Sequence, residues 1–143
     1  MLRCLPVALL AMILASAAAR AEDDMNFCQG TTQHEIDMCC EGSTQYEMNM
    51  CEGHKFKMAD REMTARYSKL MARLEPEGRA SLRKARRAWE SYRDNMCLFE
   101  AIGLGSARSM VFSGCLTKLT REHIKLLDYH LTCKEGDLSC KSW

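Results

Sequence analysis

The chain has 143 residues, with 20 Lys and Arg against 19 Asp and Glu, so its formal net charge is only +1 at pH 7. This length accommodates one domain with one modest hydrophobic core, and we expect no second domain. The near balance of charge argues against nucleic acid as a partner, because binding to a phosphate backbone draws on a clear excess of basic residues.

The first 21 residues have the pattern of a secretory signal peptide. Arg3 precedes an apolar run over residues 5–15, and small residues then lead to Ala19-Arg20-Ala21, an A-x-A cleavage pattern. The run is shorter than the roughly 20 apolar residues that a bilayer-spanning helix needs, so a retained membrane anchor is the less favoured alternative. We expect cleavage near Ala21, no transmembrane segment in the mature chain, and a single periplasmic or secreted domain over residues 22–143.

Charge is unevenly distributed along the expected mature chain. Residues 22–54 contain eight acidic residues and no Lys or Arg, whereas residues 55–93 contain twelve basic and five acidic residues. The molecule should therefore be electrically polar, which could steer a charged partner, although solvated surface charge is the commoner reason for such a pattern.

Two adjacent segments, residues 28–39 and 40–51, form a tandem duplication of twelve residues with seven identities. Each copy contains Thr-x-x-Glu, the capping-box pattern of a helix start, so helices are predicted to begin at Thr32 and Thr44. Each copy also begins and ends with Cys. A segment that folds back over the first turns of its own helix would bring these two sulfurs together.

Eight cysteines follow the expected cleavage site, and an even number in a small exported chain predicts a disulfide framework. The duplication favours Cys28–Cys39 and Cys40–Cys51. A bond between Cys97 and Cys115 would close a loop, and the remaining two cysteines would fix the tail as Cys133–Cys140. The chemical alternative is a Cu(I) site with soft sulfur ligands from Met38, Cys39, Cys40 and Met50, although export favours oxidation.

Three long stretches show apolar residues at spacings of three and four, the period of an amphipathic helix. The first helix is predicted over residues 44–74, with its stripe at Phe56, Ala59, Met63, Tyr67, Leu70 and Leu74. Residues 75–78 supply Pro and Gly for a turn. The second stripe comprises Leu82, Ala85, Trp89, Tyr92, Met96 and Phe99.

Residues 103–114 lose this period and predict a loop, after which the third stripe comprises Leu116, Leu119, His123, Ile124, Leu127 and Leu131. No strand-like alternation is found in the sequence. The predicted fold is all-α: a disulfide-stapled antiparallel helical hairpin, with the first two stripes buried face to face, plus a third long helix.

Two motifs resemble the LprI-type lysozyme-inhibitor domain of bacterial envelope proteins. They are TQxEMNxC over residues 44–51 and W-x-x-[FY]-R-D-x-x-C-x-F-E over residues 89–100, and the resemblance extends over roughly residues 40–131. Further matches are Cys40, Ala59-Asp60, Tyr67, Ala88, Cys115 and Leu119-Thr120. The chain departs from the usual family pattern at Met63-Thr64, Arg86 and His123. The resemblance implies an exported helical domain, which in some members inhibits lysozyme.

The leading functional hypothesis is an envelope binding protein that blocks a cationic lysozyme or another muramidase by occlusion rather than catalysis. Rigid presentation of the acidic segment would lower the ordering cost of binding. The expected electrostatic contacts are Glu35, Asp37, Glu41, Glu47 and Glu52. Alternatives are a structural or stress-related periplasmic module with another partner, and a Met- and Cys-rich copper-binding protein.

No pattern of catalytic or cofactor-binding residues emerges from the sequence, so we expect no enzyme, no cofactor and no metal site. There is no Gly-x-Ser-x-Gly elbow, and the four histidines do not have the spacing of a zinc motif. Trp89, Arg93 and Asp94 lie close together on the second helix, where a structural ion pair beside the apolar stripe is favoured over a binding cluster. The basic run over residues 79–87 is interpreted as a solvated helix face.

Overall fold

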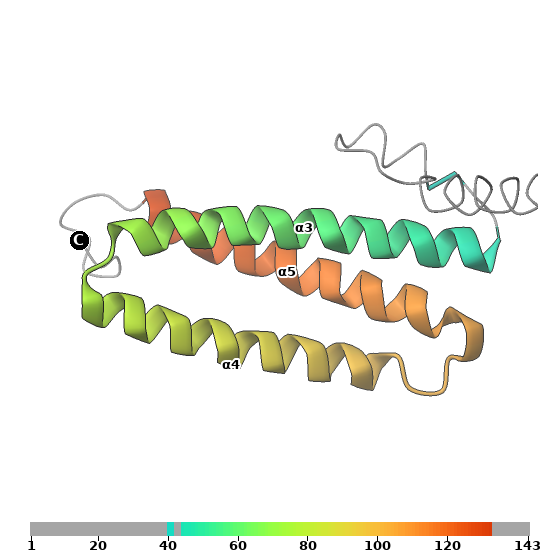
Figure 1. The fold of residues 1–143 in the computed structure, drawn as a ribbon. Coiled ribbons are helices and arrows are strands. Elements are labelled where there is room, and N and C mark those ends of the chain that lie inside the picture. The colour runs from blue at the N-terminus through green and yellow to red at the C-terminus, as the bar shows by residue number, and fades with distance from the viewer. Residues whose placement is uncertain (1–39, 42–43, 133–143) are drawn as a thin grey trace, which may run out of the picture.

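The computed structural model describes residues 40–41 and 44–132 of the chain (Figure 1). The expected signal peptide, the first copy of the duplication, and the Cys28–Cys39 and Cys133–Cys140 bonds lie outside these residues.

Three long helices and one short 3₁₀ helix make up the described part of the chain. They are α3 (Gln45–Arg73), α4 (Pro76–Glu100), η1 (Gly105–Ala107) and α5 (Arg108–Thr132), in that order. Consecutive long helices run antiparallel (Figure 1), and residues 40–41 and 44–132 contain no β-strand. The predicted all-α fold with three long helices is confirmed, but the prediction that the first two stripes pack face to face is wrong, because α3 packs mainly against α5.

The first helix begins where the Thr-x-x-Glu pattern predicts. Thr44 is the N-cap of α3, and the backbone N–H of Glu47 donates to its hydroxyl oxygen at 3.2 Å. The Glu47 carboxylate accepts in return from the backbone N–H of Thr44 at 2.9 Å, which completes a capping box. The helix ends before Leu74, and Pro76 starts α4 at a position where its missing N–H costs no hydrogen bond.

The loop predicted over residues 103–114 is wrong for its second half, because α5 already begins at Arg108. The turn itself is shorter and uses Gly103 and Gly105, whose φ angles of 79° and 54° lie in the left-handed region. Gly114 lies inside α5, where a Cβ atom would be 3.4 Å from the Glu52 carboxylate. This glycine is therefore part of a helix and not of a turn.

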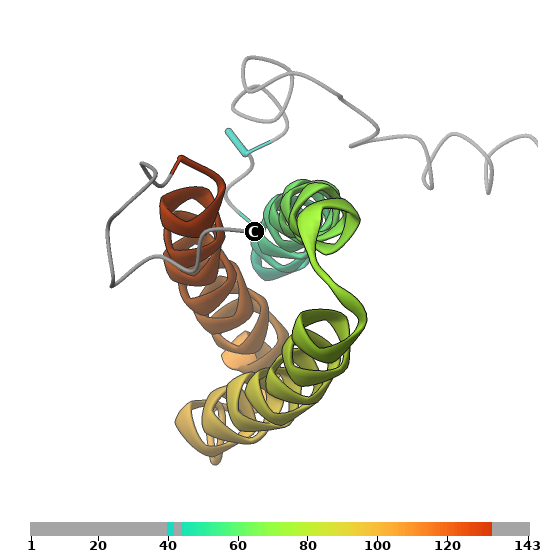
Figure 2. The same ribbon diagram turned by 90° about the vertical axis from the view of Figure 1, so that its left-hand side faces the viewer.

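The main core lies between α3 and α5, which form the most extensive helix pair of the molecule. Its buried residues are Met63, Leu70, Leu74, Ile124 and Leu127. Figure 2 shows the three helices in a triangular arrangement, and α4 adds the partly buried Leu82 and Trp89 to this core. The predicted stripes of α3 and α5 are thus largely confirmed as core.

The predicted stripe of α4 is only partly buried, and this is a correction. Tyr92, Met96 and Phe99 are 56%, 38% and 69% exposed, whereas Arg93 and Cys97 are the buried residues of this helix. The arginines of α4 contact the aromatic rings of α3: the Arg86 guanidinium lies 4.4 Å from the Tyr67 ring centroid. Long cationic side chains therefore fill space between α3 and α4 that direct apolar packing was predicted to fill.

None of the helices in residues 44–132 combines the length and the apolar character that crossing a membrane would require.

Candidate functional site

Two disulfide bonds lie at one end of the helical bundle, where α3 begins, α4 ends and α5 begins (Figure 1). Cys40–Cys51 ties the segment before α3 to its second turn, with 5.2 Å between the Cα atoms. Cys97–Cys115 links α4 to α5, with 5.4 Å between the Cα atoms. Both bonds were predicted and are confirmed. We refer to residues 40–41, 44–51 and 96–115 as the stapled end.

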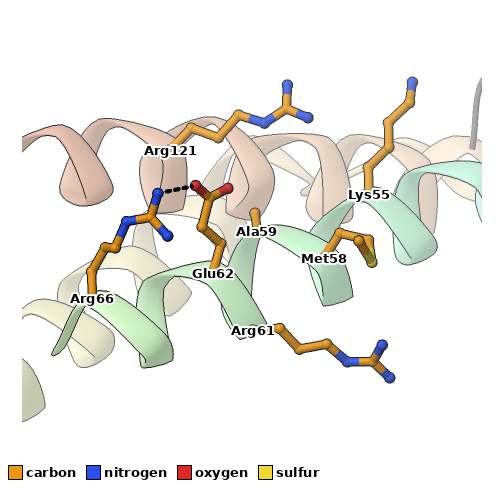
Figure 3. A pocket seen from close by; sticks show the side chains of 7 residues that line it. All are labelled: Lys55, Met58, Ala59, Arg61, Glu62, Arg66 and Arg121. Carbon is orange, nitrogen blue, oxygen red and sulfur yellow. Dashed lines mark ion pairs between the residues drawn. The ribbon is translucent and has the colours of Figure 1, made fainter. Parts of the chain in front are cut away.

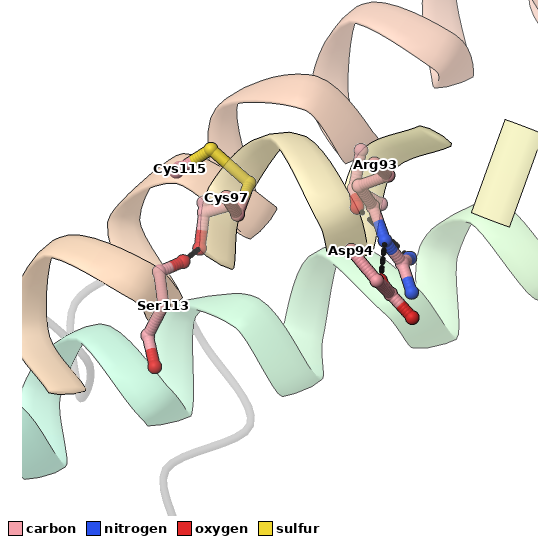
Figure 4. The surroundings of a disulfide bond; sticks show 7 residues. Arg93, Asp94, Cys97, Ser113 and Cys115 are labelled. Atoms are coloured by element: carbon pink, nitrogen blue, oxygen red, sulfur yellow. Dashed lines mark hydrogen bonds and ion pairs between the residues drawn. A yellow bond between two sulfur atoms is a disulfide. The ribbon is translucent and has the colours of Figure 1, made fainter. Parts of the chain in front are cut away.

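The cystine between α4 and α5 is at the centre of a second small core (Figure 4). Cys97 is fully buried, Cys115 and Leu116 are nearly so, and Phe56 and Phe112 pack against them. A covalent bond and aromatic packing thus hold the surface around the α4–α5 turn in one shape.

Large apolar side chains are exposed on this rigid end. Ile102 and Phe99 are 70% and 69% exposed, and Tyr46 at the start of α3 is 62% exposed. Leu98 and Leu104 are also exposed. We call these five residues the apolar rim. Four of the five lie within residues 98–104, at the α4–α5 turn. Exposed apolar side chains on a rigid turn are typical of a protein-binding surface, in which a few aromatic and aliphatic anchors supply most of the binding energy.

The acidic residues expected to contact a partner have different surroundings. Glu41 is exposed beside Cys40. The Glu47 carboxylate is engaged in the capping box of α3, and Glu52 is paired with Lys55 at 2.8 Å. Glu35 and Asp37 lie outside the described residues. The structure therefore leaves Glu41 as the freest described member of the set and gives Glu47 and Glu52 roles within the fold.

The apolar rim is the feature that sequence reasoning missed. The helical spacing of Phe99 from Tyr92 and Met96 predicts that Phe99 belongs to the buried stripe of α4. Burial of Arg93 and Cys97 at neighbouring positions turns that stripe toward solvent. The two motif cysteines could have indicated this, since a cystine to another helix fixes which face of α4 points inward.

Arg93 precedes the stapled end in α4 and contacts residues of all three long helices. Its guanidinium donates to Asp94 at 2.8 Å (Figure 4) and to the Thr120 hydroxyl at 3.4 Å, and it lies 3.6 Å from the Asp60 carboxylate. The rings of Phe56 and Trp89 lie 5.2 Å and 5.0 Å from it. With a residue exposure of 7%, Arg93 is a structural link, as the sequence analysis favoured.

Trp89 also contacts α5 through His123. The two rings are stacked with centroids 4.0 Å apart and an interplanar angle of 13°. Burial, and then the charges of Arg86 and Arg93, lower the pKa of His123 below its usual value of 6.5, while Glu90 acts in the opposite direction. Burial and the two arginines therefore favour the neutral imidazole at this position.

The described residues hold no group of three or more His, Cys, Asp or Glu side chains that could bind a metal ion. The Cu(I) alternative required Cys40 as a thiolate ligand, yet Cys40 is bonded to Cys51. Cys97 and Cys115 are likewise consumed by a disulfide bond. These bonds remove the soft anionic sulfur that Cu(I) binding, or a thiol nucleophile, would need at these four positions.

Comparison with known proteins assigns the family. Residues 37–127 match the family described as Lysozyme inhibitor LprI. The chain is also 31% identical over 138 residues to an uncharacterized protein of Rhizobium meliloti (strain 1021), covering 85% of this chain and 90% of that protein. No solved structure matches the chain significantly. Together with the helical fold and the two cystines at the motif positions, these matches show that the chain belongs to the LprI lysozyme-inhibitor family.

Proposed function

We propose that this protein is exported and binds a lysozyme or a related muramidase, which it blocks by covering the enzyme surface with its stapled end. The observation that carries the proposal is the apolar rim, which is exposed on a surface fixed by two cystines. Membership of the LprI family supports the class of partner. The signal-peptide pattern of residues 1–21 and the disulfide bonds support an oxidising compartment outside the cytoplasm.

Rigidity is what makes this surface suited to inhibition. A loop that must be ordered on binding loses affinity through the entropy of its side chains and backbone. The turn after α4 avoids this cost, because Cys97–Cys115 closes it and Gly103 and Gly105 already adopt the required left-handed conformations. Phe99 and Ile102 would then act as anchors that enter a concave partner surface without rearrangement.

Charge would contribute mainly to the rate of association. Glu41 and Glu100 are exposed at the stapled end and have the sign that attracts a cationic lysozyme. Glu35 and Asp37 would add to this field if the segment before Cys40 lies near the partner. Glu47 and Glu52 contribute their charge but hold their positions through Thr44 and Lys55.

The direct test is inhibition of lysozyme by the purified mature protein, residues 22–143, at low salt. We expect inhibition at micromolar concentrations or below. The double variant Phe99→Ser/Ile102→Ser should weaken it at least tenfold, because it removes two exposed anchors without touching the core. Leu126→Ser is the matched control: Leu126 is 51% exposed on α5 but lies outside the stapled end, so inhibition should be unchanged.

Two results would end the proposal. One is an absence of inhibition by the wild-type protein at micromolar concentration. The other is an equal loss of inhibition in the control and in the double variant, since this would mean that no particular surface is used. Circular dichroism of each variant checks that the helical fold is retained.

A further inference from the structure

A groove outside the stapled end lies between α3 and α5, where basic side chains predominate. It is a groove of about 400 Å³ lined by Lys55, Met58, Ala59, Arg61, Glu62, Arg66 and Arg121 (Figure 3). Its volume falls within the range of about 300–1,000 Å³ that is usual for small-molecule sites. Four cationic residues and one carboxylate on two packed helices make it a candidate site for an anion.

The positive charge of the groove is only partly neutralised. Glu62 is paired with Arg66 at 3.0 Å, and Arg66 also donates to Asp128 at 3.0 Å. Arg66 therefore neutralises the one acidic lining residue. Arg61 and Arg121 have no carboxylate partner among residues 40–41 and 44–132. The charge of Arg121 is thus available to a ligand.

Lys55 is the second cation with unused donors. It pairs with Glu52 at 2.8 Å, and its side chain is 28% exposed. An ammonium group has three N–H donors, so this one contact leaves two for a ligand. Figure 3 shows the Arg121 side chain extending from α5 in the direction of Lys55, whereas Arg61 leaves α3 on the other side. Arg121 from α5 and Lys55 from α3 are therefore the two lining cations that we take as candidates to hold an anionic group.

Small and apolar residues line the rest of the groove. Ala59 is 4% exposed and, with only a methyl side chain, leaves room above α3. Met58 adds a flexible apolar wall. A ligand that fills this groove would have an anionic group near Arg121 and Lys55 and an organic part beside Met58.

We propose that the groove between α3 and α5 binds an organic molecule carrying a phosphomonoester, held by Arg121 and Lys55. The planar guanidinium forms two parallel hydrogen bonds with a phosphate, and a lysine ammonium adds a compact point charge. A doubly charged phosphomonoester matches two cations better than a singly charged carboxylate does. The groove does not include the apolar rim, so this inference is independent of lysozyme inhibition.

The phosphomonoester could belong to a soluble metabolite or to a lipid headgroup, and binding measurements separate the two. The mature protein is titrated by calorimetry with glucose 6-phosphate, with glucose and with glucuronate. It is also sedimented with vesicles of phosphatidylcholine, with and without phosphatidate. We expect glucose 6-phosphate or phosphatidate vesicles to bind, and glucose, glucuronate and pure phosphatidylcholine to bind at least tenfold more weakly or not at all. Binding only to phosphatidate vesicles would support the site with a lipid as its source.

Arg121→Gln tests the site, and Arg87→Gln on the exposed face of α4 is its matched control, because both variants lose one exposed arginine charge. We expect at least a tenfold loss of affinity for Arg121→Gln and less than a twofold change for Arg87→Gln. Equal losses would overturn the proposal, since binding would then follow net charge alone. Glucuronate binding as tight as that of glucose 6-phosphate would also overturn it, as would an absence of binding to both phosphate probes.

Discussion

Trp89 of α4 and His123 of α5 stack face to face with 4.0 Å between their ring centroids. Arg93 lies over the same Trp89 ring at 5.0 Å, and Phe56 of α3 lies 5.2 Å from Arg93. A series of π and cation–π contacts therefore connects all three long helices through one tryptophan.

The burial of His123 beside Arg86 and Arg93 should make folding stability depend on pH. The pKa of His123 is lowered in the folded protein by burial and by Arg86 and Arg93, so the unfolded chain binds the proton more readily. The contribution of this histidine to stability is therefore complete above pH 6.5, its unfolded value, and is lost as pH falls through 6.5 toward the lower folded pKa. Urea unfolding between pH 8 and pH 5 should show decreasing stability.

His123→Phe retains an aromatic ring against Trp89 but cannot be protonated, so it should flatten this pH dependence. His130→Gln is the control for the general loss of a histidine on the same helix. If the pH profile of His123→Phe matched that of the wild type, the titration of His123 would have no part in the pH dependence.

Replacement of Arg93 should destabilise the fold more than replacement of an exposed arginine. We expect Arg93→Met to lose about 2 kcal/mol of unfolding free energy, because it removes charge-assisted hydrogen bonds and cation–π contacts while keeping most of the side-chain volume. Arg93→Lys keeps the charge without the planar donor group and should lose about half as much. Arg87→Met, exposed on the same helix, should stay within about 0.5 kcal/mol.

The two cystines should differ in their effect on stability. Cys97 and Cys115 are separated by 18 positions, and replacing both with Ala should lose about 3 kcal/mol. Cys40 and Cys51 are separated by 11 positions, so the corresponding double variant should lose slightly less. Denaturant unfolding of the oxidised proteins measures both. A larger loss from the Cys40–Cys51 pair would contradict this order.

The capping box at the start of α3 gives a further prediction. Thr44→Ala removes the hydroxyl that accepts from the Glu47 N–H and should cost about 1 kcal/mol. Thr44→Ser retains that oxygen and should be close to wild type. Thermal unfolding of both variants provides the measurement, and equal stability of the two would show that the cap does not matter once Cys40–Cys51 is formed.

The sequence predicted the helices well but assigned one helix face incorrectly. In α3 the apolar stripe coincided with the core, so Ala59, Met63 and Leu70 are buried as predicted. In α4 the inward face carries a cystine and a buried arginine. The spacing of apolar residues in the sequence does not detect either of them. The apolar rim therefore remained hidden until the structure fixed the rotation of α4 about its axis.

This corrected orientation of α4 can be tested by substitution. Met96→Gln changes an exposed side chain and should alter the free energy of unfolding by no more than about 0.5 kcal/mol. Leu127→Ala removes a side chain that is only 2% exposed and should cost about 2–5 kcal/mol. If Met96→Gln proved as costly as Leu127→Ala, the stripe of α4 would be core after all.

The start of α5 illustrates a second limit of sequence patterns. Three glycines and three serines in residues 103–114 predict an irregular segment, yet residues 108–114 belong to α5 and Gly114 lies inside the helix. Glycine and serine favour turns but are tolerated inside a helix, so composition alone does not locate the start of α5. The partner-binding acids expected from charge alone could not be ranked either, because the capping and ion-pairing roles of Glu47 and Glu52 depend on their three-dimensional neighbours.

Neither of the two described cystines joins α3 to another helix. Cys40–Cys51 is closed within the start of α3, and Cys97–Cys115 joins α4 to α5. The chain at Leu74 and Glu75 is thus the one covalent connection between α3 and the α4–α5 pair within the described residues. Two molecules could exchange their α3 helices about this hinge, forming a domain-swapped dimer, without reducing either of these bonds.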